Sequence, residues 1–264
     1  MFLKRKYHIL LAAFILLAST SCQQVIDLKL DNAAPQIVIE GIVTNQAAVQ
    51  TVKISESVPF SNTNTFPPVS GAIVTITDNH NNTYNLTEGV PGTYNSIKFQ
   101  GRVGYVYMLT VQLKGKTYTA TSVMPAPVRF DDLTYKDGFF NADKKLVTVH
   151  YQDPLNIANQ YHFLMFVNGV QVKTIIENDD NFSNGRYVDF DLFEDNIDIR
   201  IGDQVVVEAQ CTDRNMFLYW FSLSQQQGGG GAAPTPSNPP TNLSGGALGY
   251  FSAHTVQRLA IAIK

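Results

Sequence analysis

The sequence has 264 residues, of which 44% are hydrophobic and 16% charged, and its formal net charge at neutral pH is −3. This length is enough for one large domain or two modest ones. Beyond the first few residues there is no basic run, so the acidic balance argues against nucleic acid as a partner and against electrostatic adsorption to anionic lipid.

The beginning of the chain predicts an export signal. Residues 4–6 are basic, residues 9–18 form an apolar run without charge, and small residues then lead to Cys22. This is the order of a secretory signal peptide, and the apolar run is shorter than the roughly 20 residues that a membrane-spanning helix needs. A cysteine directly after small residues resembles the lipobox of bacterial lipoproteins, whose cysteine is acylated after cleavage.

We therefore predict a signal peptide over residues 1–21, a lipid on Cys22 and a lipidated tether over residues 22–34. The signal carries three positive charges, so its removal leaves 243 residues with a net charge of −6. The membrane contact is then a covalent lipid and not a basic protein face. The alternative is an ordinary cleaved signal that leaves Cys22 as a spare thiol.

Residues 35–125 show short runs in which apolar and polar residues alternate, which is typical of half-buried β-strands. The predicted strands are 36–43, 51–55, 72–77, 83–86, 105–113 and 116–121. The segments 69–76 (VSGAIVTI), 92–94 (GTY) and 104–111 (GYVYMLTV) resemble transthyretin-like, carboxypeptidase-regulatory-like β-sandwich modules of exported proteins. That resemblance implies a scaffold, since such modules are rarely catalytic.

Two prolines, Pro125 and Pro127, predict a boundary because they disrupt strand pairing. Beyond them we predict strands at 145–151, 161–167, 170–176, 186–193, 204–211, 247–253 and 256–263. A helix is expected at about 213–227, capped by Asp213 and ended by Gly228, followed by a mobile Gly/Pro-rich loop over 225–240. The predicted fold class is mainly β, with a transthyretin-like β-sandwich at 35–125 and a second β-sandwich-like domain at 126–264 that contains the helix and the loop.

Four short segments suggest a family. They are 37–41 (IVIEG), 69–72 (VSGA), 238–242 (NPPTN) and 245–253 (GGALGYFSA). With the start at Cys22, they resemble a Bacteroidota lipoprotein family catalogued as domain of unknown function 4249. Members of that family usually accompany TonB-dependent outer-membrane receptors. The resemblance implies an outer-membrane location, on either the periplasmic face or the cell surface, and a possible receptor partner.

Acidic residues gather between positions 177 and 198, where Arg186 is the only base. The calcium-site candidates in this stretch are Asp179, Asp180, Asp189 and Asp191, because calcium prefers several oxygen ligands. The favoured interpretation is that these acids form a solvated face without a ligand. A third interpretation is that two of them are the paired carboxylates of a glycoside hydrolase. We predict no metal and no other cofactor, with calcium kept as the alternative.

Catalytic motifs are missing from the sequence. No histidine has another histidine or a cysteine at zinc-ligand spacing, and there is no Gly-x-Ser-x-Gly nucleophile motif. His80 is expected to be solvated in a turn, His162 to be an ordinary histidine at a strand edge, and Cys211 to be buried and inert. We therefore predict no catalytic residue.

The helix and the segment after the loop are rich in aromatic residues. Trp220 and Phe221 on the helix and Tyr250 and Phe251 beyond the loop are candidates for a partner-binding surface, since aromatic side chains often anchor interfaces. The alternative is that all four lie in the core and the loop is a spacer.

The resulting functional hypothesis is a non-catalytic outer-membrane lipoprotein that binds a ligand or assists a TonB-dependent transporter. Two alternatives stay open, a structural or adhesive envelope lipoprotein and a hydrolase with an unrecognised acidic site. A receptor gene next to this one would favour the first hypothesis, and a deep pocket with convergent acids would favour the last.

Overall fold

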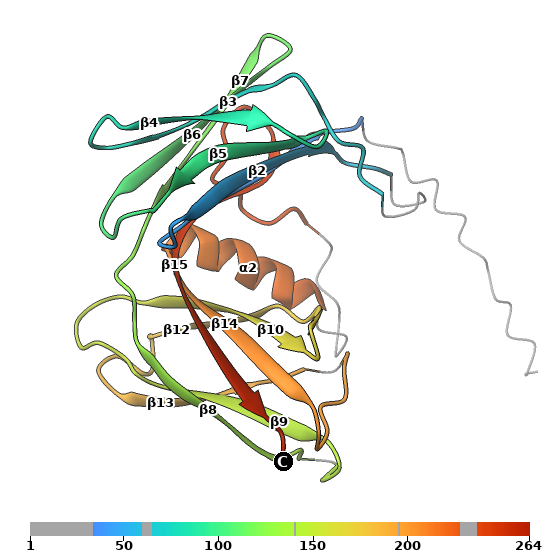
Figure 1. The fold of residues 1–264 in the computed structure, drawn as a ribbon, viewed down its shortest axis with the longest axis vertical. Helices are drawn as coiled ribbons and strands as arrows, with labels where there is room; N and C mark the ends of the chain where they lie inside the picture. The colour runs from blue at the N-terminus through green and yellow to red at the C-terminus, as the bar shows by residue number, and fades with distance from the viewer. Residues whose placement is uncertain (1–33, 60–64, 140, 195, 228–236) are drawn as a thin grey trace, which may run out of the picture. The chain divides into compact units, whose positions relative to one another are not determined.

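The computed structural model describes residues 34–59, 65–139, 141–194, 196–227 and 237–264 (Figure 1). The predicted signal peptide, the lipid attachment at Cys22 and nearly all of the tether lie outside the described residues, as does the centre of the predicted loop at 228–236. Pro35–Lys264 forms a single compact unit. No helix within the described residues is long and apolar enough to cross a membrane.

Most of the described chain is β-strand, arranged in a large sheet and a small one (Figure 1). The large sheet has the order β11-β10-β14-β15-β1-β2-β5-β4-β3-β6-β7, with β12 pairing β10, and the small sheet has the order β13-β9-β8. The strands of the large sheet are β1 Ile37–Thr44, β2 Ala48–Glu56, β3 Ile73–Asp78, β4 Thr83–Glu88, β5 Thr93–Phe99, β6 Val106–Leu113, β7 Lys116–Val123, β10 Gln160–Val167, β11 Val170–Gln171, β12 Ile176–Asp179, β14 Gln204–Thr212 and β15 Leu248–Ala262. Those of the small sheet are β8 Phe130–Asp137, β9 Lys145–Gln152 and β13 Tyr187–Leu192.

The predicted fold class is confirmed: the chain is mainly β, and α2, at Arg214–Gln227, is the only helix among the described residues. Asp213 caps α2 as expected, because its carboxylate accepts a hydrogen bond from the Met216 amide at 3.0 Å. Two strands, β5 and β8, were not predicted, since neither shows a clean apolar alternation. The single strand predicted at 170–176 is instead two short strands, β11 and β12.

The last strand, β15, connects the two parts of the large sheet. Its first half runs parallel to β1, where Leu248 faces Val38, and its second half runs antiparallel to β14, where Thr255 faces Cys211. The prediction of two separate strands here was wrong, because β15 changes partner without a turn. Gly249 permits the close approach to β1, since a Cβ at that position would lie 2.1 Å from the Ile39 carbonyl oxygen.

Two hydrophobic clusters form the main core. One lies among β1 to β7 and includes Tyr94, Tyr107 and Leu109. It is completed by Phe251 and Ala253 from β15, so this cluster draws on residues from both predicted domains. The other lies between the small sheet and the β10–β14 region, where edge-to-face aromatic rings pack together.

Candidate functional site

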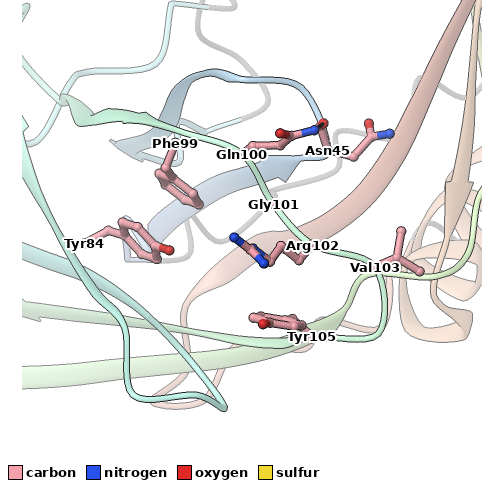
Figure 2. Close-up of a pocket in the computed structure, with 8 residues that line it drawn as sticks. All are labelled: Asn45, Tyr84, Phe99, Gln100, Gly101, Arg102, Val103 and Tyr105. Carbon is pink, nitrogen blue, oxygen red and sulfur yellow. Dashed lines mark hydrogen bonds between the residues drawn. The ribbon is translucent and has the colours of Figure 1, made fainter.

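A groove of about 690 Å³ lies beside β4, β5 and the segment that leads into β6 (Figure 2). We call it the Arg102 groove. Its lining residues are Asn45, Tyr84, Phe99, Gln100, Gly101, Arg102, Val103 and Tyr105. Its volume falls within the roughly 300–1,000 Å³ that is usual for small-ligand sites.

Aromatic rings form two sides of the Arg102 groove. Tyr84 of β4 and Phe99 of β5 stack with ring centroids 3.8 Å apart and planes 11° apart. On the other side, Tyr105 stacks on His80 at 4.0 Å. Because each ring is held by a neighbouring ring, the aromatic surfaces are pre-positioned and would lose little rotamer freedom on binding.

The backbone of the loop between β5 and β6 is bonded internally. Its hydrogen bonds run from Gly101 N to Thr44 O (2.9 Å), from Arg102 N to the Tyr107 hydroxyl (2.8 Å), from Gly104 N to Met124 O (2.8 Å) and from Tyr105 N to Arg102 O (3.2 Å). Gly101 is needed there, since a Cβ would lie 2.7 Å from Thr44 O. The loop is therefore a fixed wall whose amide donors at these four positions are already used.

Arg102 supplies the positive charge of the groove. Its side chain is exposed, and its guanidinium makes no hydrogen bond or ion pair with any residue that the structure describes. Figure 2 shows it between the Tyr84–Phe99 pair and Tyr105. Burial and the nearby charge of Asp78 raise the pKa of Tyr84, whereas the charge of Arg102 opposes that rise.

The carboxylate of Asp78 does not compete for Arg102. It accepts hydrogen bonds from the backbone amides of His80 (2.9 Å) and Asn82 (3.0 Å), and from the Asn82 side-chain amide at 2.8 Å. Burial raises the pKa of Asp78, but these hydrogen bonds and the nearby His80 together lower it more, so the net pKa lies below its ordinary value. Asp78 is therefore ionised at neutral pH and already bonded, while the Arg102 guanidinium stays available.

A second, smaller concavity of about 160 Å³ lies between α2 and the large sheet. We call it the histidine pocket. It is lined by Ile42, His162, Leu164, Gln171, Gln210, Trp220, Tyr250, Ser252 and His254. On β15, Tyr250, Ser252 and His254 share one face by strand alternation, whereas Phe251 and Ala253 point into the opposite core.

The two histidines of this pocket are buried and neutral. His162 stacks on Trp220 at 4.7 Å with planes 1° apart, and its Nδ1 has no hydrogen-bond partner in the described chain. His254 Nδ1 lies 2.8 Å from the Ser252 hydroxyl. Burial lowers the pKa of His162 to about 3, with His254 adding to the effect, and lowers the pKa of His254 to about 4.

The expectation for His162 as an ordinary edge histidine was wrong. Only 4% of its surface is exposed, because α2 covers the face of β10 on which it lies. The hydrogen bond between the Ser252 hydroxyl and His254 Nδ1 resembles that between a serine nucleophile and its histidine base. A base with a pKa near 4, however, is poorly matched to proton abstraction at neutral pH.

The calcium candidates fall in two separate places. Asp189 and Asp191 lie on β13, where Asp189 contacts His150 Nδ1 at 2.6 Å and Asp191 accepts a hydrogen bond from Lys136 Nζ at 2.6 Å. At the end of β12, Asp179 bonds the Asn181 amide, and Asp180 is buried and accepts a hydrogen bond from Asn159 N at 3.0 Å. No group of three or more histidine, cysteine, aspartate or glutamate side chains in the described chain is arranged to hold a metal ion.

The four aromatic partner candidates have different environments. Phe251 is fully buried, so it is not part of any surface, and Tyr250 is only 9% exposed against Tyr219 and Trp220. Both face inward because α2 and the core cover the two faces of β15. Phe221 is 43% exposed, which leaves it as the member of the set best placed to meet a partner.

Cys211 lies buried and unpaired, as predicted, and its sulfur accepts a hydrogen bond from Val128 N at 3.3 Å. The Arg102 groove was not predicted at all. Its lining comes from the end of β1, from β4, from the unpredicted strand β5 and from the loop after it, so no short motif contains it. The sequence signal that could have drawn attention to it is the dense aromatic content between Tyr84 and Tyr107.

Comparison with known proteins gives a family. No curated protein matches this chain. Among solved structures, the Yersinia pseudotuberculosis adhesin InvE matches 66% of this chain and 55% of its own at 18% identity, with a TM-score of 0.22, too low to support an argument. The family profile, in contrast, matches residues 23–260, and the chain therefore belongs to the family described as Domain of unknown function (DUF4249).

Proposed function

We propose that this protein is a non-catalytic lipoprotein of the bacterial outer membrane that binds a small ligand and assists a TonB-dependent transporter. The observation that carries the ligand-binding part is the Arg102 groove, in which pre-stacked aromatic rings surround an unpaired guanidinium. The location and the transporter follow from the N-terminal pattern that ends at Cys22 and from the receptors that usually accompany the family.

A binding role is favoured over catalysis by the chemistry of the two concavities. The Arg102 groove is lined by aromatic, amide and guanidinium side chains, and none of its lining residues is a carboxylate, histidine, serine or cysteine. The histidine pocket does hold a Ser252–His254 contact, but both side chains are at most 3% exposed and His254 is a weak base. Such a pair is poorly suited to attack a substrate.

The anchor is tested by metabolic labelling with a palmitate analogue. The wild-type chain should be labelled and found in the outer-membrane fraction, whereas Cys22→Ala should be unlabelled and either retained as precursor or released. Cys211→Ser is the matched control, because it removes the other cysteine without touching the signal. Labelling of Cys22→Ala at the wild-type level would remove the lipoprotein part of the proposal.

The transporter partner is tested by cross-linking in native membranes and identification of the captured proteins. A TonB-dependent receptor should be enriched with the wild-type chain. Phe221→Ser should lower that enrichment at least several-fold if the exposed face of α2 meets the receptor, while Phe182→Ser should not. Phe182 is the control since it is 93% exposed and lies in the turn after β12, not on α2. Capture without any such receptor would contradict the accessory role and favour a structural one.

A further inference from the structure

We propose that the Arg102 groove binds an anionic saccharide, namely a pyranose ring that carries a carboxylate. This inference rests on the ligand-binding part of the proposed function and specifies its ligand class. Three properties of the groove support it: flat aromatic platforms, a free guanidinium between them, and a loop in which four backbone amides are already bonded within the protein.

The aromatic platforms suit the apolar faces of sugar rings. Tyr84, Phe99 and Tyr105 are half-buried, so each keeps part of its ring accessible while packing fixes its orientation. Ring faces carry negative quadrupole charge and attract polarised C–H groups, which a pyranose presents on its flat faces. The hydroxyls of Tyr84 and Tyr105 make no hydrogen bond with another described residue, so they can bond sugar hydroxyls.

The guanidinium of Arg102 selects a negative charge. Arginine presents a planar fork of donors that matches a carboxylate in two parallel hydrogen bonds, and such charge-assisted bonds are roughly twice as strong as neutral ones. Arg102 is free to make them because Asp78, whose charge also acts on Tyr84, is already bonded by the His80 and Asn82 amides. The chain carries a net negative charge, so we assign recognition of the anionic ligand to the positive charge of Arg102.

The backbone of the groove argues against a peptide as the occupant. A peptide that adds as a strand needs unpaired main-chain donors and acceptors at its binding edge. At Gly101, Arg102, Gly104 and Tyr105 the amide donors are all bonded within the protein. The loop therefore offers no continuous run of free amides for strand addition, and side chains supply most of the recognition, as they do when rings and their substituents are bound.

The test uses the full chain and matched ligands: a galacturonic acid trimer, the same trimer with its carboxyls reduced, and benzoate. Isothermal titration calorimetry should show binding of the acidic trimer at least tenfold tighter than binding of the other two, which corresponds to about 1.4 kcal/mol. In the complex, NMR should show upfield shifts of the sugar ring protons, because they lie over aromatic faces.

Arg102→Gln is the decisive variant, since the side chain is exposed and makes no hydrogen bond or ion pair with another described residue. It should weaken binding of the acidic trimer at least tenfold and leave the reduced trimer within about twofold. Arg129→Gln is the matched control: Arg129 is also exposed, its side chain being 88% accessible, but it lies on the approach to β8. It should bind the acidic trimer as the wild-type chain does.

Three outcomes would overturn the inference. They are no binding of the acidic trimer at millimolar concentration, equal affinity in Arg102→Gln, and benzoate binding as tightly as the trimer, which would point to an aryl carboxylate. None of them bears on the lipid anchor or the receptor, which are tested by labelling and cross-linking. A chain that captures a receptor but fails to bind the trimer would refute the ligand class and leave the proposed location and partner standing.

Discussion

Acidification should destabilise this protein through the histidine pocket. His162 and His254 are buried and neutral in the folded chain, with pKa values lowered by burial to about 3 and about 4. In the unfolded chain each imidazole takes up a proton near its ordinary pKa of 6.5. Between these values the unfolded state binds more protons than the folded state, so stability must fall as pH falls from about 6.5 toward 4.

The size of the effect follows from the shifts. At pH 4.5 both imidazoles are mostly protonated in the unfolded chain and mostly neutral in the folded one. At about 1.4 kcal/mol per pH unit, each histidine then lowers the free energy of unfolding by roughly 2.5 kcal/mol relative to neutral pH. Together they remove about 5 kcal/mol, a large part of the roughly 5–15 kcal/mol that stabilises a typical domain.

The assay is urea unfolding at a series of pH values between 7.5 and 4.5. The chain's single tryptophan, Trp220, provides the fluorescence signal, and it lies directly on His162. His162→Phe keeps a ring against Trp220 and removes the titrating group, so it should abolish about half of the pH-dependent loss. His254→Gln should abolish the other half. His80→Asn, a substitution at an exposed turn histidine, is the control and should leave the slope unchanged.

This pH window separates the histidines from the acids whose pKa the fold lowers. Glu177, which faces His162 across β10 and β12 and whose pKa burial raises, acts in the opposite direction within the window. Carboxylates whose pKa is lowered in the fold, such as Asp78 and Asp191, lose their contribution only as pH falls below about 4. If the stability of the wild-type chain is flat between pH 6.5 and 4.5, or if both histidine variants keep the full slope, the buried neutral pair is not the cause and the argument fails.

Three further predictions concern the fold and the acidic segment. Gly249→Ala should destabilise the chain by about 3 kcal/mol in thermal or urea unfolding, because the new Cβ would collide with the backbone of β1. Gly246→Ala, where the space is open, should cost only about 1 kcal/mol, and similar losses would refute the contact at Gly249. Asp213→Ala should cost at least about 1–2 kcal/mol, because it removes the α2 cap and also the bonds that this carboxylate accepts from Ser122 Oγ and Val123 N, and a neutral result in the same assay would mean that the cap contributes nothing. Millimolar calcium should leave the melting temperature unchanged, since the acids within 177–198 are dispersed over separate strands, and a rise that chelator reverses would show a site there.

Local patterns in the sequence predict much of the secondary structure. Period-two alternation identifies β1, β3, β6, β7, β9 and β14 within a residue or two, because one face of each strand is apolar and lies in a core. β10 is identified instead as a nearly continuous apolar run, which is typical of a strand buried on both faces. Asp213 marks the start of α2 through capping chemistry, which is local by nature, whereas the predicted stop at Gly228 lies outside the described residues. The segments 37–41, 69–72, 238–242 and 245–253 suggest the family, because each is a contiguous stretch that can be recognised without knowledge of the tertiary structure.

What depends on distant contacts was decided only by the tertiary structure. The sequence cannot show that β15 leaves β1 and continues on β14, because strand pairing depends on which edge is free when the sheet assembles. His162 is buried because α2, more than fifty residues later in the chain, packs over it. The Arg102 groove exists because β4, β5 and the loop before β6 bring Tyr84, Phe99 and Arg102 together. Side-chain burial and site geometry depend on the neighbours that folding supplies, and those neighbours are not encoded within any single segment.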